Sequence, residues 1–227
     1  MTEGQIDQLR QKLKSWVDEI GNEIGSLLTG RKIFQRLQEI VNSNEKIQSP
    51  HIFHDWVADN YVAKMCSCVR ALAENNPRNK PVSLYMLIEK IKKNPHAITR
   101  DYFISQSRDD FAKEMGTAGN DFDTFAKPGE QYIDSKRLDS DLQKLAEGTR
   151  LIGDFTDQWI AHFDQKPKIE RMPTFEDLNK ALDIIDEVWC DYYLLLTCHG
   201  LGSGTRQPVI AEDWEAPLRY PWIVEQE

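Results

Sequence analysis

A histidine and an aspartate near the end of an expected helix are the residues of this 227-residue chain best suited to acid–base chemistry. His162 follows Asp157 by five residues in the segment FTDQWIAHFD. An imidazole titrates near neutral pH, and a positioned side chain of this kind can transfer a proton. Residues five apart on an α-helix lie on different faces, so the two would meet only through a kink, a bound ligand or a second chain. His162 is therefore either functional or a capping or packed histidine, since a helix C-terminus favours its cation.

Cysteine and glycine spacing point away from metal and nucleotide chemistry. Cys66 and Cys68 are two residues apart, which directs their thiols to opposite sides of a helix, while Cys190 and Cys198 would lie about 12 Å apart along one. Neither pair can hold a tetrahedral ion without further ligands. The glycine-rich segment at 200–205 lacks the lysine of a phosphate-binding loop. We therefore expect no metal and no cofactor.

The charge of the chain is unevenly distributed. Its net charge is −9, yet residues 1–100 hold 15 of the 28 Lys and Arg and only 11 of the 37 acidic residues. A net acidic protein gains little from nonspecific attraction to phosphates, but a local basic patch can still bind them. That patch could equally be an ordinary solvated surface. The candidate RNA-binding residues within 78–100 are Arg78, Lys80, Lys90, Lys92, Lys93 and Arg100.

The elements that must position these residues are nearly all helical. Apolar residues recur at steps of three and four along 6–27, and we expect Thr29-Gly30 to separate this helix from a second one over 33–41. Further helices are predicted over 51–74, with Trp56 on its buried face, and in short pieces over 83–94 and 99–105. Long helices are predicted over 134–163 and 174–198, the last opened by a capping box of Thr174 and Asp177.

The fold expected from this pattern is an all-α bundle of long antiparallel helices. Residues 1–204 form a single domain, in which the irregular excursion 106–133 is either packed or a lid, and 205–227 form a Trp/Pro-rich tail packed on the bundle. The composition, with 40% hydrophobic and 29% charged residues, is typical of a globular chain. No apolar run is long enough to span a membrane, the polar start predicts no signal peptide, and the four cysteines fit reduced thiols in a cytoplasmic protein.

Several segments in order resemble the HEPN superfamily, and within it the AbiU-type abortive-infection branch of bacterial proteins. They begin with DNYVAKMCSCVRAL, VSLYMLIEKI and HAITRDYF, and continue with FDTFAKPGEQYID and DQWIAHFD. The last is PTFEDLNKALDIIDEVWCDYYLLLT, followed by the tail with its PW pair. The resemblance spans most of the chain from about residue 50.

The resemblance implies an all-α bundle that often forms homodimers. Active members are metal-independent ribonucleases, with a motif of Arg, four to six further residues, and His. Two copies of the motif meet in the dimer and act on the ribose 2′-OH and the scissile phosphate. Carried over by position, His162 matches the motif histidine and Asp157 the polar position after the arginine. Thr156 stands where the motif has Arg, so the main cation is missing, and Arg70 or Arg150 could replace it across the bundle.

Two hypotheses follow from this departure. The first is a HEPN-like interaction module that binds a protein partner or RNA in a phage-defence or toxin–antitoxin setting, with a degraded catalytic motif. The second is a metal-independent ribonuclease that uses His162, Asp157 and Arg70 from two chains. If RNA binds, the basic patch at 78–100 is its expected docking surface, because acidic residues surround His162.

Overall fold

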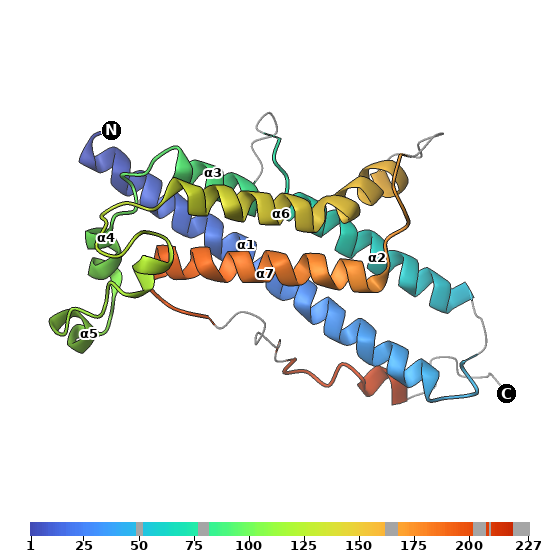
Figure 1. Ribbon diagram of the computed structural model, residues 1–227. Helices are drawn as coiled ribbons and strands as arrows, with labels where there is room; N and C mark the ends of the chain where they lie inside the picture. Colours follow the sequence, from blue (N-terminus) through green and yellow to red (C-terminus); the bar gives the residue numbers. More distant parts are fainter. Residues whose placement is uncertain (49–51, 77–81, 162–167, 202–207, 209, 220–227) are drawn as a thin grey trace.

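The computed structural model describes residues 1–48, 52–76, 82–161, 168–201, 208 and 210–219. They form an all-α bundle, which confirms the fold class expected from the sequence. The long helices are α1 (Glu3–Asn42), α2 (Ile52–Leu72), α6 (Ser135–Phe155) and α7 (Phe175–Thr197). Figure 1 shows that α2 runs back against α1, and α7 back against α6. No helix in the described part of the chain is long and apolar enough to span a membrane.

The expected break at Thr29-Gly30 is wrong, because α1 continues through it as a 40-residue helix. The Thr29 hydroxyl donates to the Gly25 carbonyl at 2.9 Å and so stays within the helix. Gly30 faces Met65 of α2, whose sulfur would lie 3.8 Å from a Cβ at that position. Packing against α2 therefore outweighs the weak helix propensity of this dipeptide.

The core lies between the long helices α1, α2, α6 and α7, and the helix over Leu84–Lys92 adds to it. The Trp189 indole of α7 lies over Gly21 of α1 and donates from Nε1 to the Val17 carbonyl at 2.8 Å. Helix α7 begins at the predicted capping box: the Thr174 hydroxyl accepts from the Asp177 N–H, and the Asp177 carboxylate accepts from the Thr174 N–H. This hydrogen-bonded start fixes the end of α7 that meets α2 and α6.

Short elements close the opposite end of the bundle. They are α3 (Leu84–Lys92), α4 (Arg100–Gln106), α5 (Asp110–Glu114) and η1 (Asp121–Thr124). The excursion 106–133 contributes buried residues to the core, among them Phe122 and Phe125. The described part of the tail contains η3 (Ala216–Arg219) and contacts α1, where Glu215 forms an ion pair with Arg36 at 2.9 Å.

Candidate functional site

The structure brings together Arg70 and Asp157, two of the candidate site residues. They are 87 residues apart in the sequence and lie on different helices. Arg70 lies in the last turn of α2, and its Nε donates to Asp157 Oδ1 at 2.6 Å. Its NH1 also donates to Glu74 Oε2 at 2.7 Å. The guanidinium therefore already has a carboxylate on two of its nitrogens, and this pairing lowers its value as a free cation for a phosphate.

Asp157 lies in η2 (Thr156–Ala161), a π-helix that continues directly from α6. Thr156, at the position of the motif arginine, is 2% exposed, and its hydroxyl donates to the Ile152 carbonyl at 2.7 Å. An arginine here would have to bury its charge or change the local backbone, and burying an unpaired charge is costly. This position therefore differs from the motif in two ways: it holds threonine in place of arginine, and its side chain is buried in the core.

The π-helix was not expected from the sequence. Its hydrogen bonds join residues five apart, which is the spacing between Asp157 and His162. His162 itself lies outside the described residues.

A polar pocket of about 190 Å³ lies beside the Arg70–Asp157 pair. Two arginines and three carboxylates line it, so its formal charge is negative. One of the arginines, Arg150, forms an ion pair with Glu170 at 3.0 Å, and the hydrogen bond between them lowers the pKa of Glu170. Such a pocket is unfavourable for a bare phosphate. Its charged lining residues are Arg70, Glu74, Arg150, Asp154 and Asp157.

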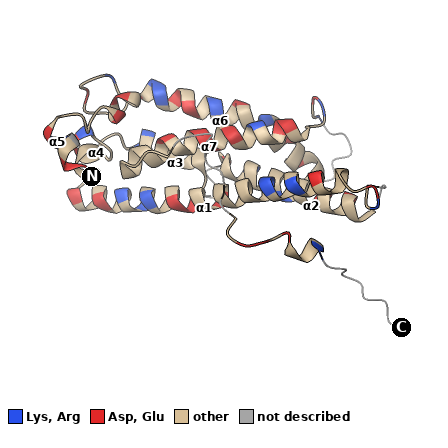
Figure 2. Cartoon of the chain, turned by 90° about the horizontal axis from the view of Figure 1, so that it is seen from below, with Lys and Arg blue, Asp and Glu red and all other residues tan. Residues whose placement is uncertain are grey.

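Most described residues of the basic patch form ion pairs. Lys92 pairs with Asp139 of α6, and Lys93 with Glu89 at 2.6 Å. Lys90 has no carboxylate partner among the described residues. Arg78 and Lys80 lie outside the described residues. Figure 2 shows basic and acidic positions interspersed along α1 and α6.

Arg100 is held by contacts within the fold. Its guanidinium pairs with Asp123 and donates to the Glu130 and Gly119 carbonyls, each at 2.9 Å. The side chain is 13% exposed. These contacts tie α4 to the excursion 106–133, and a residue used in this way has few donors left for RNA.

The exposed aromatic surface at the start of α2 was missed by the sequence reasoning. Trp56 is 60% exposed, whereas the apolar spacing placed it on the buried face. Ile52 and Phe53 beside it are also exposed, and the rings of Phe53 and Trp56 stack with centroids 6.3 Å apart. Figure 1 shows why: the first turns of α2 extend beyond the start of α7. Helical periodicity identifies an apolar face but does not show what lies opposite it.

Cysteine and carboxylate positions give no metal cluster in the described part of the chain. No three His, Cys, Asp or Glu residues there lie close enough to hold one ion. The four cysteines form no disulfide bond in the described part of the chain. Comparison of the chain with protein-family models, curated proteins and solved structures finds no match.

Proposed function

We propose that this chain is a HEPN-like helical interaction module of the cytoplasm, which forms homodimers and binds proteins in a phage-defence or toxin–antitoxin setting. The observation that carries the proposal is the exposed apolar strip at the start of α2, formed by Ile52, Phe53 and Trp56. Aromatic side chains are enriched at protein interfaces. Adjacent exposed apolar side chains mark surfaces that another molecule covers. A second copy of the chain is the first occupant we expect, because the resemblance implies a dimer.

The electrostatics support a protein partner over RNA. Arg70 is held by two carboxylates, and Lys92, Lys93 and Arg100 each have an acidic partner. RNA affinity depends on cations that are free to replace the counterions of phosphates. Cations that already bind carboxylates contribute little to such an exchange, whereas an uncharged aromatic strip needs no counterion.

A metal-independent ribonuclease is the alternative, and one observation favours it. Asp157 lies in a π-helix, and single π-turns occur frequently at functional sites. In this reading His162 would take the proton of the ribose 2′-OH. Arg70 would leave its ion pair with Asp157 and then stabilise the charge on the phosphate. The alternative needs that release, because the Arg70–Asp157 pair otherwise occupies the cation.

A photo-crosslinking amino acid at position 56 tests the interaction module in cells. Gln11, which is exposed in the N-terminal third of α1, provides the matched control position. We expect a discrete protein adduct at position 56 and none at position 11. An adduct of twice the chain mass identifies a second copy, and any other protein mass identifies a different partner. An adduct that RNase removes, or no adduct from soluble protein, would overturn the proposal.

Purified protein separates the two functions directly. Wild type, His162→Ala and Asp157→Asn are incubated with total RNA in the presence of EDTA. The interaction module predicts the same uncleaved RNA in all three samples. RNA cleavage by wild type that is lost in His162→Ala would contradict the interaction module and support the ribonuclease.

A further inference from the structure

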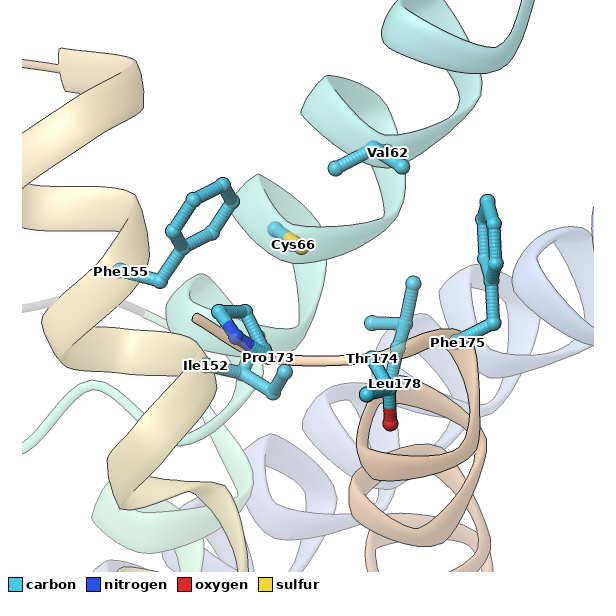
Figure 3. Close-up of a pocket in the computed structure, with 8 residues that line it drawn as sticks. All are labelled: Val62, Cys66, Ile152, Phe155, Pro173, Thr174, Phe175 and Leu178. Carbon is cyan, nitrogen blue, oxygen red and sulfur yellow. The ribbon is translucent and has the colours of Figure 1, made fainter. Parts of the chain in front are cut away.

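An apolar pocket of about 350 Å³ lies between α2, the end of α6 and the start of α7. Figure 3 shows Val62 and Cys66 on one side, Ile152 and Phe155 on another, and Pro173 to Leu178 across from them. This volume falls in the range of small-molecule sites. The pocket is separate from the exposed strip of α2 and from the polar pocket beside Arg70, since it shares no lining residue with either. Its lining residues are Val62, Cys66, Ile152, Phe155, Pro173, Thr174, Phe175 and Leu178.

The lining contains no charged side chain, and its polar groups are already used. The Thr174 hydroxyl donates to Asp177 Oδ2 at 2.7 Å and accepts from the Asp177 N–H at 3.2 Å. Burial raises the pKa of the Cys66 thiol to about 12, so the thiol stays neutral and is a poor nucleophile. A charged ligand would lose its hydration here without compensation. The pocket therefore selects a neutral ligand that binds without covalent chemistry.

One wall of the pocket is braced by aromatic rings. Phe175 packs against Phe34 of α1 with ring centroids 5.4 Å apart, and Phe34 stacks on Tyr61 of α2 at 3.9 Å. This three-ring contact supports the Phe175 wall. Phe155 provides a second ring on the α6 side (Figure 3). Aromatic rings favour other flat rings in offset or edge-on contact, so the walls favour a planar ligand.

The volume sets the size of that ligand. A closed apolar cavity of about 150 Å³ accommodates benzene, and this pocket has somewhat more than twice that space. We propose that it binds a neutral, planar aromatic molecule of about two fused rings, of the naphthalene or indole class. This binding activity lies beyond the proposed protein interaction and does not depend on it.

Naphthalene binding to the full chain tests the proposal, measured by its fluorescence with benzene and pyrene as size competitors. We expect saturable binding of one naphthalene per chain, with both competitors at least about tenfold weaker. Naphthalene-2-sulfonate, which adds only a charge, should also bind at least about tenfold more weakly. Absence of saturable naphthalene binding to folded wild type would overturn the proposal.

Two pocket variants and one surface variant locate the site. Val62→Trp fills the pocket and should weaken naphthalene binding at least about tenfold, while Phe155→Ala enlarges it and should shift the preference toward pyrene. Lys64→Ser replaces an exposed side chain on the same helix as Val62, outside the pocket lining, and should leave the affinity unchanged within about twofold. Circular dichroism and the melting temperature establish that each variant is folded. Weaker binding in Lys64→Ser, or unchanged binding and unchanged size preference in the two folded pocket variants, would contradict the assignment.

Discussion

Arg137 and Arg70 each bind two carboxylates, yet their surroundings differ. Arg137 of α6 donates to Asp141, four residues along the same helix, at 2.9 Å, and to Asp191 of α7 at 2.6 Å. Arg70 of α2 has the same pattern, with Glu74 four residues on and Asp157 from another helix. We call the first set, together with Tyr192, the closed cluster. Arg70, Glu74 and Asp157 form the open cluster.

The two clusters differ in what surrounds their carboxylates. In the closed cluster the Asp141 side chain is 7% exposed and also accepts from the Tyr192 hydroxyl at 3.0 Å. Burial, aided by the Asp141 charge, raises the pKa of Tyr192, so that it remains a donor at all ordinary pH values. In the open cluster the Asp157 side chain is 50% exposed and borders a pocket. Both clusters join helices, and they differ in the Tyr192 hydroxyl that one contains and in the pocket that borders the other.

Removing one carboxylate from each cluster should give the largest contrast. Asp141→Ala leaves Arg137 and the Tyr192 hydroxyl without their shared acceptor. It should lower the free energy of unfolding by about 3 kcal/mol, the lower limit for a broken buried pair, since Arg137 is partly exposed. Asp157→Ala should cost less than about 1 kcal/mol because water replaces the exposed carboxylate. Urea unfolding at pH 7 measures both, and equal losses would show that the two clusters are energetically alike.

A pair of helical glycines extends the contrast to packing. A Cβ at Gly21 would overlap the Trp189 ring, so Gly21→Ala should destabilise the protein by about 2 kcal/mol. Gly153, which borders the open cluster, has nothing within 4 Å of such a Cβ. Gly153→Ala should therefore stabilise the protein by about 0.5 kcal/mol, through the better helix propensity of alanine. Thermal unfolding gives both signs, and two changes of the same sign would remove the distinction.

The sequence predicts the helices and their starts better than it predicts what lies against them. Periodicity and capping signals at Thr174, Asp177 and Ser83 identify local helices and their starts, and these are confirmed. Whether an apolar face is covered depends on neighbouring elements, which the pattern of a single helix does not show. Trp56 has an apolar helical spacing but is 60% exposed, because the first turns of α2 extend beyond the start of α7 (Figure 1).

The candidate site was partly predictable for a similar reason. The motif resemblance points to Asp157 and leaves Arg70 or Arg150 as the replacement cation. In the structure it is Arg70 that donates a hydrogen bond to Asp157. Spacing alone could not predict the π-helix, because its widened turn depends on tertiary packing as well as local sequence. Nor could it reveal that Thr156 faces the core.

The capping box at the start of α7 gives a smaller, pH-dependent effect on stability. Hydrogen bonds from Arg171, then from the Thr174 backbone N–H and hydroxyl, hold the pKa of Asp177 well below its usual value. A carboxyl whose pKa is lower in the folded state stabilises the protein above its unfolded pKa of about 4, and this contribution is lost as the pH falls further. Asp177→Asn should therefore melt below wild type at pH 7, with the difference shrinking below about pH 4.

Glu176→Gln provides the control for that profile. It removes an adjacent charge that pairs with Lys180 on the exposed surface but leaves the capping box intact. Its melting temperature should follow that of wild type more closely at neutral pH. A difference between Asp177→Asn and wild type that is constant from pH 7 to pH 3 would indicate that the carboxylate charge has no part in the cap.

The smallest effect on stability is expected at Trp56, where the effect on association should be largest. Trp56→Ser should change the free energy of unfolding by less than about 0.5 kcal/mol, because the side chain is mostly exposed in the single chain. The same substitution should lower the mass of the assembly in sedimentation, since an interface loses most when a central aromatic side chain is removed. Loss of stability without loss of assembly would place Trp56 in the fold and contradict the interface. Unchanged stability with a smaller assembly would show that the open end of the bundle is completed by another chain.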